Sequence, residues 1–109
     1  MRLPKEVIIP DEKLTRYLLV PRNWDDKSKY LAQAGFTQRN PDDLKEALTA
    51  LAATSETVQD GTNEYGEFLR TDGALTGPNG RELPVAAIWL RWRMDGSVHF
   101  VTLKPRKEK

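Results

Sequence analysis

The residues of this chain that could act chemically on a ligand are one histidine and several cations in the second half. His99 is the single histidine among 109 residues, and histidine is the side chain that changes charge near neutral pH. Arg91 and Arg93 stand two residues apart, a spacing that places both on one face of a strand. The pattern predicts phosphate binding by the arginines and proton transfer by His99, beside Thr102 or Arg91, or by Lys27 from the first half. The alternative is a solvated strand face with a structural histidine.

The segment that carries these residues alternates as antiparallel strands do. We expect strands at 67–76, 83–93 and 98–104, with Thr57 and Val58 adding a fourth at one edge. Asn79-Gly80 and Asp95-Gly96 are turn signals, because glycine adopts the positive φ that tight hairpins need. The second half is therefore predicted to be an antiparallel meander.

Alternation then divides the expected strands into two faces. Even-numbered residues of 83–93 are apolar and are predicted to meet the core, together with Val101 and Leu103. The opposite face would carry a mixed aromatic and basic patch, which is a type of surface that stacks bases and holds phosphates. The same face would also suit a protein partner, or simply face water. The predicted binding residues are Trp89, Arg91, Arg93, Phe100, Thr102 and Lys104.

The first half is predicted to be helical. Asp11 is placed to cap a helix over 11–19 that Pro21 ends, and a second helix is expected over 23–34 before Gly35. Asn40 and Pro41 begin the clearest helix, expected over 41–53. The fold class is therefore α+β: three N-terminal helices followed by a three- to four-stranded meander.

Composition and length restrict the organisation and the function. We expect one domain over 1–109, with an extended arm (1–10), a helical half (11–54), a sheet (55–104) and a disordered basic tail (105–109). A net charge of +1 argues against a bulk polyanion binder, and the absence of cysteine excludes disulfides and zinc–thiolate sites. No metal or cofactor is expected. No apolar run approaches the ~20 residues of a membrane span and no signal peptide is evident, so a cytoplasmic protein without membrane contact is expected.

Short patterns along the chain resemble an uncharacterised bacterial domain family. They include Ala34-Gly35-Phe36, Glu64-Tyr65-Gly66 and the run from Leu75 to Arg81. The family is found as small stand-alone proteins and in toxin-like proteins, and its order of elements resembles the barnase–EndoU–colicin–RelE group of small ribonucleases. Family members often carry a histidine shortly before the position of Lys27. This chain has none there, which argues against catalysis.

Two hypotheses follow, and the sequence leaves open whether the chain is an enzyme. The first is a non-catalytic interaction module linked to toxin-type systems, binding a protein partner or a second copy through the sheet face or edge; it expects Trp89 and Phe100 to be buried by another chain. The alternative is an RNA-acting, toxin-like ribonuclease domain. It expects Lys27, Arg91 and His99 to converge on one concave site.

Overall fold

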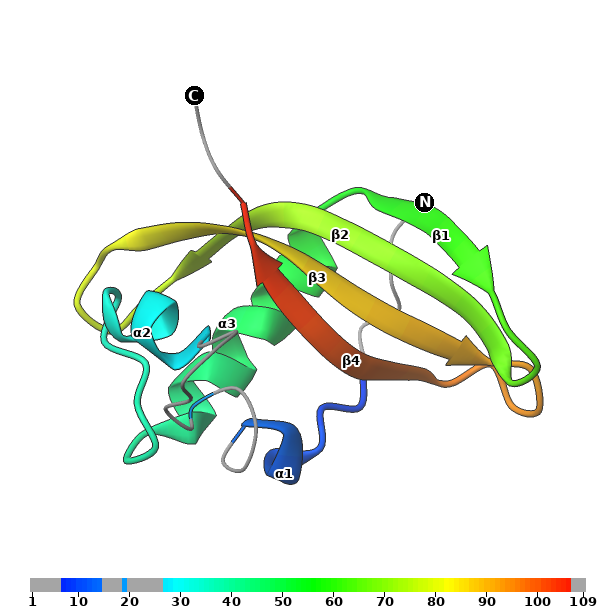
Figure 1. Cartoon of the computed structure of the whole chain (residues 1–109), viewed down its shortest axis with the longest axis horizontal. Helices are drawn as coiled ribbons and strands as arrows, with labels where there is room; N and C mark the ends of the chain where they lie inside the picture. Colours follow the sequence, from blue (N-terminus) through cyan, green and yellow to red (C-terminus); the bar gives the residue numbers. More distant parts are fainter. Residues whose placement is uncertain (1–6, 15–18, 20–26, 107–109) are drawn as a thin grey trace.

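A four-stranded antiparallel sheet with helices on one side forms the body of the molecule. The computed structural model describes residues 7–14, 19 and 27–106. The helices are α1 (Asp11–Lys13), α2 (Lys27–Ala32) and α3 (Pro41–Thr54), and the strands are β1 (Thr57–Thr62), β2 (Gly66–Thr76), β3 (Glu82–Trp92) and β4 (Val98–Pro105). The strands lie in the order β1-β2-β3-β4, and the helices are gathered beneath the sheet (Figure 1). The α+β class, the meander and the fourth strand at Thr57-Val58 are confirmed.

The core lies between α3 and the sheet face that the helices cover, which we call the inner face. Leu44, Leu48 and Leu51 recur at the three- and four-residue spacing that puts them on one side of α3, and all three are buried. The sheet supplies Leu69, Leu75, Leu83, Val85, Ala87, Trp89, Val98, Phe100 and Leu103 to the same cluster.

The predicted sheet faces are wrong for β3 and for Phe100, although Leu103 is in the core as expected. Trp89 is 0% and Phe100 is 2% exposed, so both belong to the core of their own chain, whereas Ile88 and Leu90 are half-buried and Trp92 is exposed. Trp89 and Phe100 are opposite one another across β3 and β4, with ring centroids 5.4 Å apart in an edge-on arrangement. The bulkiest residues go inward because they remove the most apolar surface from water.

The predicted first helix, over 11–19, is described only in part, because residues 15–18 lie outside the described residues. Among the described residues, α1 covers only Asp11–Lys13, and α2 and α3 are the two longer helices. The Leu19 N–H donates to the Leu14 carbonyl at 2.9 Å, a five-residue spacing that departs from the four-residue ladder of an α-helix. The predicted start of the second helix at Asn23 lies outside the described residues. The third helix agrees with the prediction to within one residue.

The β2–β3 turn is fixed against the end of α2. The Asn79 Nδ2 donates to the Gln33 carbonyl at 3.1 Å, and the Asn79 backbone N–H donates to the Ala34 carbonyl. A Cβ at Gly77 would lie 1.9 Å from the Ala34 carbonyl oxygen, so this close approach requires glycine. Residues 77–79 and 33–34, far apart in sequence, therefore form one rigid corner.

The N-terminal arm lies beside β4. Ile8 forms a parallel bridge with His99: its N–H donates to the Val98 carbonyl, and its carbonyl accepts from Phe100, each at 2.8 Å. The predicted disordered tail begins too early, because Pro105 belongs to β4 and the Arg106 N–H donates to the Pro84 carbonyl. Residues 107–109 of that tail lie outside the described residues.

Candidate functional site

The sheet face that points away from the helices, here called the outer face, carries an apolar row. Phe68 and Leu90 are directly paired across β2 and β3, Ile88 precedes Leu90 by two residues, and Trp92 follows it by two. Phe68, Ile88 and Leu90 are half-buried and Trp92 is 36% exposed. Of the described helices, none covers this face (Figure 1). The row is apolar surface of the kind that binding sites use.

Charges beside this row are paired within the sheet. The Arg70 guanidinium lies 3.3 Å from the Asp72 carboxylate and 3.8 Å from that of Asp60. Arg70 pairs with Ile88 across the strands, so this group borders the apolar row directly. Because two carboxylates flank one cation, this part of the outer face is not a positive surface.

An aromatic and basic group lies at the end of the sheet formed by the β1–β2 and β3–β4 turns. The Trp92 ring lies between Tyr65, at a centroid distance of 6.1 Å, and His99, at 5.3 Å. Tyr65 is 56% exposed, and the exposed Arg93 donates to the Asn63 carbonyl at 3.1 Å. The close approach of the strands here requires Gly66, where a Cβ would lie 1.8 Å from the Arg91 carbonyl oxygen.

His99 is oriented by a chain of hydrogen bonds from the β3–β4 turn. The Ser97 hydroxyl donates to Asp95 Oδ1 at 2.6 Å and lies 2.9 Å from His99 Nε2. Since a hydroxyl has one proton, Ser97 must accept from His99, and Nε2 therefore carries a proton. Hydrogen bonds from the Ser97 side chain and backbone, with a smaller contribution from His99, lower the pKa of Asp95. A neutral His99 would thus present Nδ1 as its proton acceptor.

The structure separates the predicted site residues. Thr102 and Lys104 lie on the outer face opposite Ile88 and Ala86. Arg91 alternates with the outer-face residues Leu90 and Trp92 and is paired with the buried Val98, so it belongs to the inner side of β3. Its guanidinium lies 3.9 Å from the Glu67 carboxylate. Trp89 and Phe100 are in the core, while Arg93 lies beside the β3–β4 turn.

Lys27 does not join this group. It begins α2, where the Tyr30 hydroxyl donates to the Pro84 carbonyl at 2.6 Å. Pro84 and Arg91 are seven residues apart on β3, or about 23 Å along the strand. The backbone of Lys27 is thus at the opposite end of the sheet from Arg91, and its side chain lies outside the described residues. The expected convergence of Lys27, Arg91 and His99 is not formed.

Sequence reasoning missed the partners of His99. The residue pattern favours Tyr65 as a strand corner and Trp92 as a core residue. A signal was present in the order Asp95, Ser97, His99: an Asp commonly accepts from the residue two positions later, which orders the turn. Ser97 in turn lies two residues before His99, and its hydroxyl is within hydrogen-bond distance of the His99 ring.

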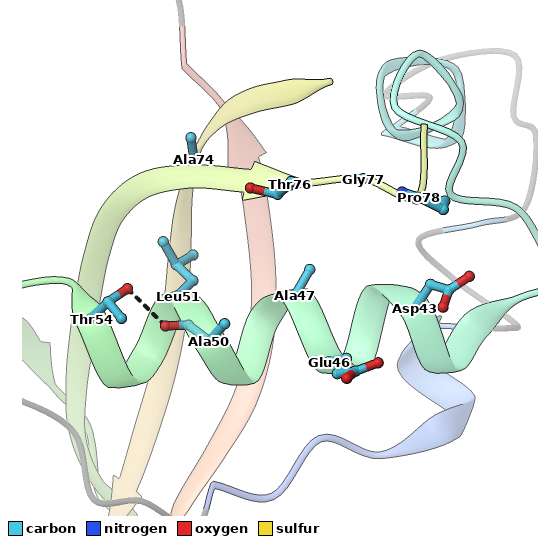
Figure 2. A pocket seen from close by; sticks show the side chains of 10 residues that line it. All are labelled: Asp43, Glu46, Ala47, Ala50, Leu51, Thr54, Ala74, Thr76, Gly77 and Pro78. Atoms are coloured by element: carbon cyan, nitrogen blue, oxygen red, sulfur yellow. Dashed lines mark hydrogen bonds between the residues drawn. The ribbon is translucent and has the colours of Figure 1, made fainter. Parts of the chain in front are cut away.

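A groove lies between α3 and the β2–β3 turn (Figure 2). This groove has a volume of about 360 Å³. Its walls are small or apolar side chains, and Asp43 and Glu46 line it toward the beginning of α3. The lining residues are Asp43, Glu46, Ala47, Ala50, Leu51, Thr54, Ala74, Thr76, Gly77 and Pro78.

Across residues 7–14, 19 and 27–106, no group of three or more His, Asp or Glu side chains is placed to hold a metal ion. In the same residues, no helix is long and apolar enough to cross a membrane.

Comparisons with known proteins identify a family and a similar fold. Residues 2–107 match the family model described as Domain of unknown function (DUF6883). No curated protein matches the chain. The solved structure of a contact-dependent growth inhibition toxin–immunity protein complex from Klebsiella pneumoniae 342 contains a similar chain, with a TM-score of 0.72, 20% identity, and coverage of 91% of this chain and 99% of that one. At this identity the likeness concerns the fold.

Proposed function

The chain belongs to the DUF6883 family of domains of unknown function, and we propose that it is a non-catalytic, protein-binding member of a toxin–immunity type system that binds its partner through the outer face of the sheet. The observation that carries this proposal is the apolar row of Phe68, Ile88, Leu90 and Trp92, which no described helix covers. The similar solved structure is a toxin–immunity protein complex, which agrees with protein partnering.

The electrostatics of the outer face favour a protein over a nucleic acid. RNA binding depends on cations that neutralise phosphates, and Arg70 is already flanked by Asp60 and Asp72. A protein interface instead combines an apolar centre with paired polar groups at its rim. The apolar row with its bordering ion pairs has this composition.

A site-specific photo-crosslinker tests the proposal in the source bacterium. Placed at Ile88, it should give one discrete protein adduct, whereas the same group at the exposed Ala53 on α3 should give none. The identified partner is then purified and its affinity measured by calorimetry. Leu90→Glu should weaken binding by at least about tenfold, since burying an unpaired charge at the centre of an interface costs more than ~1.4 kcal/mol.

Ala53→Glu is the matched control, because it adds the same charge on the helical side. Equal adducts at both positions, or equal affinities for the two variants, would contradict the outer face as the interface. Circular dichroism of both variants checks that the sheet is retained.

A second candidate function, action on RNA, is favoured by one specific observation. His99 is oriented by Ser97 and Asp95 and lies against Trp92, with Tyr65 and Arg93 nearby. Aromatic rings stack on unpaired bases, an arginine holds phosphate, and an oriented imidazole moves a proton. This candidate corresponds to the resemblance to the barnase–EndoU–colicin–RelE group.

Incubation of the purified protein with total bacterial RNA separates the two candidates. Our first proposal expects no cleavage and no growth arrest when the protein is expressed in the cytoplasm. Cleavage that His99→Gln abolishes, while the exposed-surface variant Gln38→Ala does not, would replace it with the second candidate.

A further inference from the structure

We propose that the groove between α3 and the β2–β3 turn binds a long cationic side chain, lysine or arginine, from a basic segment of a partner protein. The groove is lined by α3 and the β2–β3 end of the sheet and shares no residue with the outer apolar row, so the inference stands independently of the function proposed above. It rests on the shape of the groove, its charge and its fixed walls.

Small side chains create the hollow. Ala47 and Leu51 point from α3 toward the segment that carries Thr76, and Ala50, Ala74 and Pro78 add further small or apolar lining (Figure 2). The Thr54 hydroxyl at the far end donates to the Ala50 carbonyl at 2.8 Å, within its own helix. The walls are therefore chiefly apolar and would contact the methylene stem of a lysine or arginine, which is the packing these amphipathic side chains favour.

Two carboxylates give the groove its charge preference. Asp43 and Glu46, three residues apart on α3, both line the groove toward the beginning of that helix (Figure 2). The Asn40 Nδ2 donates to Asp43 Oδ2 at 2.9 Å, which holds that carboxylate in place. Among the described residues, no basic side chain forms an ion pair with Glu46, and the neighbouring Lys45 instead lies 3.4 Å from Asp11. The rim would attract an ammonium or guanidinium group and repel a phosphate.

The wall formed by the β2–β3 turn is held in position before any ligand binds. Asn79 fixes it to the end of α2, and the Gly77 backbone packs directly against Ala34. A preformed groove avoids the entropy cost of ordering a loop on binding. A single protruding side chain suits a hollow of this size better than a second folded surface.

The probe is an acetylated, amidated hexapeptide of alternating lysine and glycine, titrated into the isotope-labelled full chain by NMR. Saturable shifts are expected at the amides of Ala47, Ala50, Thr76 and Gly77. The same peptide with norleucine in place of lysine keeps the stems and lacks the charges, and it should produce no saturable shift.

Two pairs of variants locate the contact. Glu46→Gln should raise the Kd by about two- to fivefold, the range that one exposed ion pair supports, and Asp42→Asn, which removes a charge from the same helix outside the groove, should leave it unchanged. Ala50→Leu should block the groove, while Ala53→Leu on the exposed side of α3 should not.

The overturning results are distinct. Shifts spread over all acidic surfaces, equal effects of Glu46→Gln and Asp42→Asn, or no saturable shift would each exclude the proposal. Shifts of the same amides with protein concentration alone would assign the groove to a second copy of the chain and likewise overturn it.

Discussion

The indole Nε1 of Trp89 donates a hydrogen bond to the Thr71 hydroxyl at 3.0 Å inside the core. Both side chains are 0% exposed and come from adjacent strands, β3 and β2. An aromatic residue with a polar group is stable in a core only when that group finds a partner. Thr71 is that partner, and it explains why the core contains a buried threonine opposite α3.

Replacing this threonine tests its role. Thr71→Val keeps the shape but leaves the indole N–H without its acceptor, so the free energy of unfolding should fall by about 1–3 kcal/mol. Thr71→Ser keeps the hydroxyl, so the loss of this hydrogen bond should not lower its free energy of unfolding. Urea denaturation followed by Trp fluorescence measures both, and a Thr71→Val protein as stable as the wild type would show that the bond contributes nothing.

The fixed corner between α2 and the β2–β3 turn should depend on Asn79. Asn79→Ala removes the bond to the Gln33 carbonyl and the bond that its Oδ1 accepts from the Arg81 N–H. The expected loss is about 1 kcal/mol, because both bonds are exposed and water partly replaces them. Thermal unfolding monitored by circular dichroism gives the value, with the exposed Gln38→Ala as the comparison. Equal losses in the two variants would contradict the role of Asn79 in fixing the corner.

Close backbone contact at the same corner should make Gly77 intolerant of any side chain. A Cβ there would overlap the Ala34 carbonyl oxygen and also lie 2.4 Å from the Ala34 Cβ, so Gly77→Ala should cost at least about 1–3 kcal/mol as an overpacked site. Gly61→Ala meets no atom within 4 Å and faces only the strain of its positive φ. Denaturant unfolding of both variants compares the cost of atomic overlap at Gly77 with the cost of backbone strain at Gly61. A smaller loss of unfolding free energy for Gly77→Ala than for Gly61→Ala would refute the close contact.

The Asp95 turn should show a defined pH dependence. Its folded pKa is lowered by the Ser97 hydrogen bonds, so its stabilising effect is complete above the unfolded value of about 3.9 and is lost as the pH falls through the lower folded pKa. Asp95→Asn keeps an acceptor oxygen and removes the charge. The stability difference between wild type and variant should therefore be present at neutral pH and shrink in acid.

Chemical denaturation across that pH range measures the difference. His99 faces Asp95 through Ser97, so the series is repeated with His99→Gln in both backgrounds to remove the imidazole. A difference that stays constant from neutral to strongly acidic pH would mean that the Asp95 charge does not stabilise the turn.

Local sequence signals determined the start of α3 and the positions of the two hairpin turns. Asn40 and Pro41 start α3, the Asn79-Gly80 and Asp95-Gly96 pairs mark two hairpin turns, and Gly80 and Gly96 have the positive φ values of 84° and 72° that those turns require. These signals act within a few residues, so they are readable without knowing the fold. The α+β class and the four antiparallel strands follow from them.

Only the tertiary structure decided which face of the sheet is buried and where the candidate sites lie. In β3, Val85, Ala87 and Trp89 alternate with Ala86, Ile88 and Leu90, so both faces are apolar and alternation cannot choose between them. The irregular register between Ile88 and Trp89 then places Phe100 and Leu103, three residues apart on β4, both in the core. Strict two-residue alternation cannot give that result. The outer apolar row, the Tyr65–Trp92–His99 stack and the groove beside α3 all depend on this packing between distant segments, which no local pattern specifies.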